Sequence, residues 1–209
     1  MPQACLHLRY NSVMQLPSPN SVTPPRYASH LRFPPYTYVP GLAPHPISSP
    51  QGHSYQHHPS ESSPLNRQNW QTHDAYLSGI DLWNFGYYWE AHEIWESAWK
   101  STRTAPSDNT PKLSSLHTFL QALIKLAAAG VKHREENATG TERHLSRSLE
   151  LFTPFLSENN LCGLEIATIC HQISHLSSGK TPWITIPTAK TAAPLVIFPF
   201  QITIHSFVK

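Results

Sequence analysis

The strongest constraint on the fold of this chain is a tryptophan-rich stretch, LSGIDLWNFGYYWEAHEIWESAWK, which spans residues 77–100 and holds four of the six tryptophans. Two helical patterns meet within it at Gly86, because glycine adopts the left-handed conformation that ends a helix at little cost. The spacing predicts helices over residues 74–85 and 88–100. On the second helix, apolar residues three and four apart form one face. Glu90 falls on the opposite face, which we expect to meet solvent.

Three further amphipathic segments, over residues 113–134, 141–152 and 161–176, also predict helices. A shift of 50 residues superimposes small and large apolar residues of two successive helical pairs. This alternation is typical of tetratricopeptide-like hairpins, in which small residues let two helices approach closely. The sequence thus predicts an all-α fold of about five helices in antiparallel hairpins. The superimposed pairs are Gly79 with Ala129, Ala91 with Thr141, Trp95 with Leu145 and Trp99 with Leu149.

Proline divides the chain unevenly, since 13 of the 20 prolines precede residue 66. Residues 1–32 lack periodicity and are predicted to be disordered. Residues 33–67 are a Pro/His/Tyr-rich arm and hinge. Because proline-rich backbone is extended and loses little entropy on docking, we expect the arm to pack on a helical domain over residues 68–180. The C-terminal tail, residues 181–209, is apolar and β-prone near its end. It is expected to be an irregular strand on the body or, in the interpretation we prefer, poorly ordered.

Charge and cysteine content narrow the classes of partner. A net charge of +2 is too small to favour nucleic acid, and no apolar run reaches the roughly 20 residues that a membrane helix needs. The cysteines Cys5, Cys162 and Cys170 show no disulfide spacing, which favours a reducing compartment. We therefore expect a cytoplasmic protein with no nucleic-acid or membrane partner. An acid-poor, serine-containing N-terminus leaves an organellar transit peptide as the alternative.

Two motifs carry a resemblance to a known family. Residues 84–96 read Asn-Phe-Gly-Tyr-Tyr-Trp-Glu-Ala-His-Glu-Ile-Trp-Glu, and residues 119–129 read Phe-Leu-Gln-Ala-Leu-Ile-Lys-Leu-Ala-Ala-Ala. Over residues 74–157 this order resembles a bacterial family known as domain of unknown function 309. Ala122 and Glu136 depart from its pattern, which usually has glycine at both positions. The resemblance implies an all-helical domain and implies no activity.

A His-Glu-x-x-Glu string on the second predicted helix is the motif with the most chemical potential. His92 and Glu96 are neighbours there, because residues four apart share a helix face. In zinc-protease helices, two ligands four apart flank a general-base glutamate. His92 and Glu96 are therefore candidate metal ligands, and Glu93 is the candidate catalytic base. Zinc fits nitrogen and oxygen ligands, whereas a carboxylate-rich site suits manganese or iron. Candidates for the third ligand are His133, His45 and His53.

The same residues have a structural interpretation, which we prefer. His92 and Glu96 can form hydrogen bonds at a contact between two helices. Gln121 and Lys125 lie one turn apart on the long predicted helix. They can meet Glu93 or Glu96 there, since buried polar groups need partners. We call the set His92, Glu96, Gln121, Lys125 and His133 the polar seam.

Two functions follow from these patterns. The first is a non-enzymatic binding or scaffold module for an unknown protein or small-molecule partner, with the polar seam as its most distinctive surface and no cofactor. The second is a metal-dependent hydrolase that uses the His-Glu-x-x-Glu helix and a divalent metal such as zinc. Trp89 points away from the main apolar face, so we expect it to contact the arm, a partner or water.

Overall fold

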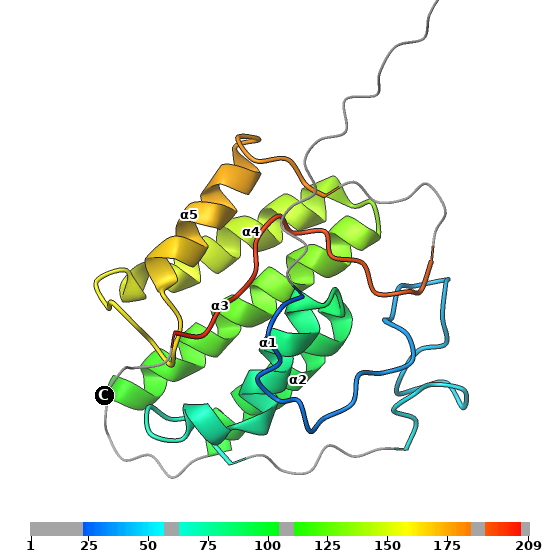
Figure 1. Ribbon diagram of the computed structural model, residues 1–209, viewed down its shortest axis with the longest axis horizontal. Coiled ribbons are helices and arrows are strands. Elements are labelled where there is room, and N and C mark those ends of the chain that lie inside the picture. Colours follow the sequence, from blue (N-terminus) through cyan, green and yellow to red (C-terminus); the bar gives the residue numbers. More distant parts are fainter. Residues whose placement is uncertain (1–22, 57–62, 105–110, 185–190, 206–209) are drawn as a thin grey trace, which may run out of the picture.

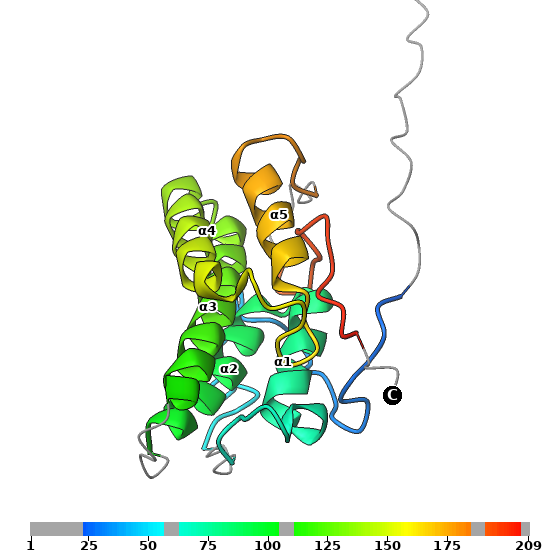
Figure 2. The same ribbon diagram turned by 90° about the vertical axis from the view of Figure 1, so that its left-hand side faces the viewer.

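The computed structural model describes residues 23–56, 63–104, 111–184 and 191–205. Consecutive α-helices pack on one another from the first to the fifth (Figure 1 and Figure 2). The all-α prediction of about five helices is confirmed. No helix in the described part is both long enough and apolar enough to cross a membrane. The helices are α1 (Asp74–Asn84), α2 (Tyr88–Thr104), α3 (Pro111–Arg134), α4 (Ala138–Phe152) and α5 (Ile166–Ser177), with short 3₁₀ turns at Trp70–Thr72 and Thr153–Phe155.

Local sequence explains where these helices begin and end. Gly86 has a φ of +84°, the left-handed value that lets the chain turn between α1 and α2, as the sequence predicts. Asn137 caps α4, because its side-chain oxygen accepts a hydrogen bond from the Gly140 N–H at 2.8 Å. Both ends therefore follow from side chains within a few residues of the boundary.

Glycines allow α1, α2 and α3 to approach one another closely. A Cβ atom at Gly79 would collide with the indole ring of Trp95, whose Nε1–H donates to the Tyr76 carbonyl at 3.1 Å. A Cβ atom at Gly130 would lie 2.6 Å from the ring of Tyr88. These contacts set the spacing of the first three helices.

Polar contacts set the register of the middle three helices. The Thr102 hydroxyl, near the end of α2, lies 2.9 Å from the His117 Nδ1 near the start of α3. The Ser148 hydroxyl on α4 donates to the Ala122 carbonyl on α3 at 2.9 Å. Both α2 and α4 pack on α3, so α3 links these two helices.

The N-terminal arm lies on α1 and α2 (Figure 1). Its ordered part begins before residue 33, since the Tyr27 and Ala28 N–H groups donate to the Asp81 carboxylate at 2.8 and 2.9 Å. Ala28 is fully buried. This corrects the predicted disorder for residues 23–32, because a buried carboxylate holds the segment without any periodic pattern; residues 1–22 lie outside the described part.

The C-terminal tail also packs on the helices over residues 191–205, contrary to the poor order that we expected. Phe198 is 1% exposed and Ile202 is fully buried. Asn84 on α1 both donates to the Ile202 carbonyl and accepts from its N–H, each at 2.8 Å, and the Tyr88 hydroxyl accepts from the Ile197 N–H at 2.9 Å. Side chains of the body thus satisfy the backbone of an extended segment that pairs with no strand in the described part.

Candidate functional site

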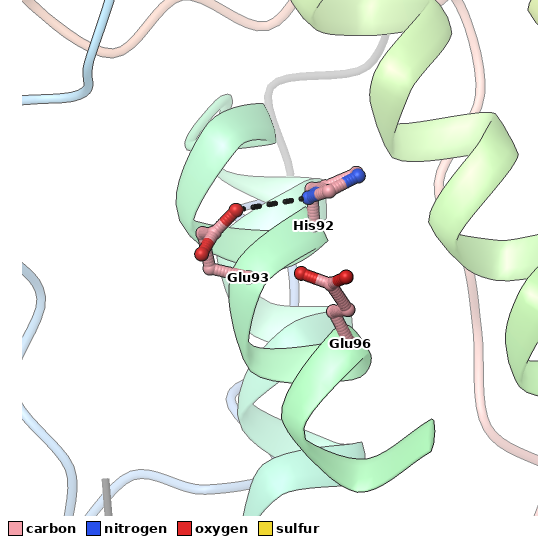
Figure 3. Close-up of side chains that lie close together, drawn as sticks. All are labelled: His92, Glu93 and Glu96. Atoms are coloured by element: carbon pink, nitrogen blue, oxygen red, sulfur yellow. Dashed lines mark hydrogen bonds and ion pairs between the residues drawn. The ribbon is translucent and has the colours of Figure 1, made fainter. Parts of the chain in front are cut away.

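Three potential metal ligands, His92, Glu93 and Glu96, lie together on α2 (Figure 3), and we call them the α2 cluster. One ligand atom from each lies within 4.8 Å of the others. The His92 Nδ1 is 3.2 Å from a Glu93 carboxylate oxygen, and a Glu96 oxygen is 3.4 Å from the Lys100 Nζ. The three side chains are 28%, 34% and 31% exposed. A solvent-borne ion or ligand can therefore reach them.

The contact between His92 and Glu93 determines what the imidazole can do. A carboxylate only accepts hydrogen bonds, so Glu93 stabilises the proton on the His92 Nδ1. The lone pair of the neutral ring then lies on Nε2, which points away from Glu93 (Figure 3). A carboxylate that orients a histidine in this way is the usual outer partner of a metal-bound imidazole. In this arrangement Glu93 positions His92, while Glu96 offers a separate oxygen ligand.

His133, a predicted member of the polar seam and candidate third ligand, lies at a different place. Its ring stacks on Trp183, with ring centroids 3.8 Å apart and planes 11° apart. Burial lowers the pKa of His133, which keeps the imidazole neutral near pH 7. Among the described residues, the group of ligand atoms within 4.8 Å of one another does not include His133. The residues after α5 therefore cover this histidine, and the α2 cluster lacks it.

Glu90, which we expected on the solvent face of α2, is a buried carboxylate at 6% exposure. The Thr37 hydroxyl and the Tyr38 N–H donate to its oxygens at 2.7 and 2.8 Å. The His53 Nε2, a candidate third metal ligand, lies 3.4 Å from Glu90 instead. The expectation for Glu90 was wrong, because the arm covers the face of α2 that the helical pattern assigns to solvent.

Trp89 contacts the arm, which is one of the three alternatives predicted for its side chain. Its ring lies 5.3 Å from that of Tyr38 and 5.6 Å from that of His45, both in edge-to-face geometry. His45, the remaining candidate for a third ligand, is thus part of an aromatic contact between the arm and α2. Trp89 and Glu90 together fasten the middle of the arm.

Asp81 is a second buried carboxylate that the sequence analysis missed. It is 1% exposed, and it accepts from the Arg26 Nε at 2.9 Å and from the backbone N–H groups of Tyr27 and Ala28. A carboxylate within an otherwise apolar helical pattern could have indicated this buried contact from the sequence, since such a group is rarely buried without partners. Asp81 and Glu90 therefore fasten the arm at two points and serve the fold.

The two α3 members of the polar seam, Gln121 and Lys125, are half-buried. Glu93 pairs with His92 and Glu96 with Lys100, and the contacts of Gln121 and Lys125 with these carboxylates stay a prediction. Among the ion pairs of the described residues, none within 4.0 Å involves Lys125. Lys125 therefore presents a half-buried positive charge that no described carboxylate neutralises.

His144 on α4 completes this part of the surface, and the sequence analysis gave it no role. Burial is the largest cause that lowers the pKa of His144, and interactions with Lys125, Arg143, Lys132 and His92 lower that pKa further. These interactions place His144 near both Lys125 and His92. Its position beside the apolar face of α4 is unremarkable in the sequence, so only helix packing reveals it. We call the set His92, Glu93, Glu96, Lys125 and His144 the charged site.

Comparison with known proteins supports the family assignment and adds no activity. No curated protein and no solved structure matches this chain. A family model described as a domain of unknown function (DUF309) matches residues 76–144. The matched segment runs from α1 to His144 on α4 and includes the whole charged site. The resemblance predicted from the sequence is therefore confirmed, and residues 76–144 are similar to DUF309, a family whose description names no function.

Proposed function

We propose that the protein is a cytoplasmic, non-enzymatic binding module, and that its charged site receives a small molecule or a partner side chain bearing both a cationic and an anionic group. Glu93 and Glu96 supply negative charge from α2, and Lys125 supplies positive charge from α3. The neutral His144 of α4 adds a hydrogen-bond donor and acceptor. Both described cysteines are free thiols, which supports a reducing compartment.

The observation that carries this proposal is the charge of Lys125. After burial, the positive charge of Lys125 is the largest influence that lowers the pKa of His144, and Arg143 and Lys132 lower that pKa further. Lys132 is neutralised by Glu135 at 2.6 Å, whereas no described carboxylate lies within 4.0 Å of the Lys125 Nζ. A half-buried cation without a partner attracts an anionic group more strongly than a fully solvated one. The carboxylates of the α2 cluster can bind a cationic group on the same ligand.

The test uses the full-length chain and three probes of similar size: γ-aminobutyrate, butyrate and butylammonium. We expect γ-aminobutyrate alone to raise the thermal unfolding midpoint in a saturable manner, because only it satisfies both charges. Lys125→Met should abolish that rise. Lys132→Met is the matched control and should preserve it, since Lys132 already has Glu135 as its partner. Equal effects of the three probes, or a wild-type response in Lys125→Met, would contradict the proposal.

A metal-dependent hydrolase is the second candidate, and the compact α2 cluster favours it. Two oxygen groups and one imidazole lie within 4.8 Å of one another on a half-exposed surface. In this role His92 Nε2 and Glu96 would be ligands. Glu93 would orient His92 and would serve as a base only after releasing Nδ1. A catalytic zinc usually has three protein ligands and one water, so the function requires a further ligand.

Metal content separates the two candidates. Elemental mass spectrometry on the untagged full-length protein should find substoichiometric zinc, manganese and iron if the chain is a binding module. Near-stoichiometric metal that is lost in His92→Ala, together with metal-dependent ester hydrolysis, would establish the hydrolase instead. His30→Ala is the control, because His30 is 61% exposed and lies 3.1 Å from Asp74, away from the α2 cluster.

A further inference from the structure

The last helix carries a pair of histidines outside the charged site. The side chains of Ile169, Ile173 and Leu176 on α5 are buried against the body. His171 is exposed and His175 is partly exposed, so both lie away from this apolar face. Residues four apart on a helix are neighbours, and the two imidazole rings are in contact with centroids 4.0 Å apart and planes tilted by 45°.

The ring nitrogens of this pair are available for binding. Among the hydrogen bonds and ion pairs of the described residues, none involves the ring of His171 or His175. Two adjacent imidazoles whose ring nitrogens have no partner among the described residues can act as a bidentate nitrogen ligand.

We propose that His171 and His175 form a binding site for a borderline divalent transition-metal ion such as Ni²⁺, Cu²⁺ or Zn²⁺, with water in the remaining coordination positions. These ions prefer imidazole nitrogen, whereas Mg²⁺ and Ca²⁺ prefer oxygen. The i, i+4 spacing is the one with which a helix presents two histidines to a single metal. Exposed rings can turn so that one nitrogen of each converges on the ion, since surface rotamers interconvert freely.

The surroundings favour this class of ion over hard cations. Lys180 is the charged group that acts on His175, and no described carboxylate forms an ion pair with either ring. A positive neighbour opposes binding that relies on charge alone, as for Mg²⁺. Nitrogen–metal bonds to Ni²⁺ or Cu²⁺ do not depend on a neighbouring carboxylate, and Lys180 is exposed, so water screens its charge.

The experiment titrates the untagged full-length chain with Ni²⁺ against a chromophoric chelator, and then compares the variants His171→Ala, His175→Ala and the double variant. The second imidazole binds intramolecularly once the first is attached, so we expect each single variant to weaken this site by roughly tenfold or more. The double variant should lose no more Ni²⁺ affinity than either single variant, because removing one histidine already prevents binding through two nitrogens. Mg²⁺ should not bind at α5 in the wild type or in any of these variants.

Two controls keep the result specific in a chain with 14 histidines. His30→Ala removes an exposed histidine that lies beside Asp74, and His92→Ala removes the imidazole of the α2 cluster. Both variants should bind Ni²⁺ at His171 and His175 with the same affinity as the wild type. His171→Gln and His175→Gln, with wild-type circular dichroism, exclude a folding defect. Equal affinity and stoichiometry in the wild type and the double variant would overturn the site, as would loss of the whole response in His92→Ala.

Discussion

Removing the carboxylate of Asp81 should destabilise the protein more than any surface substitution. Asp81 is 1% exposed and receives hydrogen bonds from the Arg26 Nε and from two backbone N–H groups, those of Tyr27 and Ala28, at 2.8–2.9 Å. Asp81→Ala removes all three acceptor contacts at once. The buried Ala28 N–H then has no replacement acceptor unless the arm moves or water enters.

The magnitude follows from these three contacts. A buried donor left without a partner costs about 1–3 kcal/mol; the Ala28 N–H is buried and the Tyr27 N–H only partly so, so the two together cost about 2–5 kcal/mol. The ion pair with Arg26 adds less than about 1 kcal/mol, because the Arg26 side chain is 26% exposed and keeps hydrogen bonds to two carbonyls. We expect a loss of about 3–5 kcal/mol in the free energy of unfolding, out of a typical total of about 5–15 kcal/mol.

Urea denaturation monitored by tryptophan fluorescence measures this loss. Asp74→Asn is the matched control on the same helix, since the Asp74 side chain is 61% exposed and should change stability by less than about 0.5 kcal/mol. If Asp81→Ala unfolds within about 0.5 kcal/mol of the wild type, the buried carboxylate does not hold the arm and the reasoning fails. A variant with lost cooperativity would be re-examined by proteolysis, which should cut first within residues 23–56.

Three further predictions address other parts of the molecule. Gly79→Ala should destabilise the fold by about 1–3 kcal/mol in the same assay, because the new methyl group collides with Trp95; a gain from better helix propensity would show that the close approach is unnecessary. The free energy of unfolding should fall as the pH drops below about 6.5, because the unfolded chain protonates His133 more readily than the folded one. His133→Phe keeps a ring against Trp183 and should flatten this pH dependence. An unchanged dependence of stability on pH in this variant would contradict the prediction. Burial raises the pKa of Cys162 to about 12, so its thiol should resist alkylation at pH 8 until urea unfolds the chain, and peptide mass spectrometry showing rapid modification of the native protein would contradict this.

Local patterns in the sequence were sufficient for the helices, except that α5 begins at Ile166 and not at residue 161 as predicted, and for part of the candidate site. Gly86 marks the corner between α1 and α2, because its backbone preference acts within one turn. The juxtaposition of His92 and Glu96 needed only the helical repeat. The contact of Trp89 with the arm was one of three alternatives that its position off the apolar face left open. The corner at Gly86 and the pairing of His92 with Glu96 depend on residues within about four positions, which is the range over which a helix correlates its side chains. The alternative that Trp89 takes depends on Tyr38 and His45 of the arm, which are distant in the sequence.

The remaining features depend on segments distant in the sequence, and only the tertiary structure decided them. Glu90 is charged and lies opposite the apolar face, yet Thr37 and Tyr38, more than 50 positions away, bury it. His144 meets the charged site because α2 and α4 share α3 as a neighbour. Irregular segments such as the arm and the tail satisfy their backbone through single side chains, so they leave no period in the sequence. The amino-acid pattern determined which segments are helical, and packing determined which polar groups are buried, paired or free.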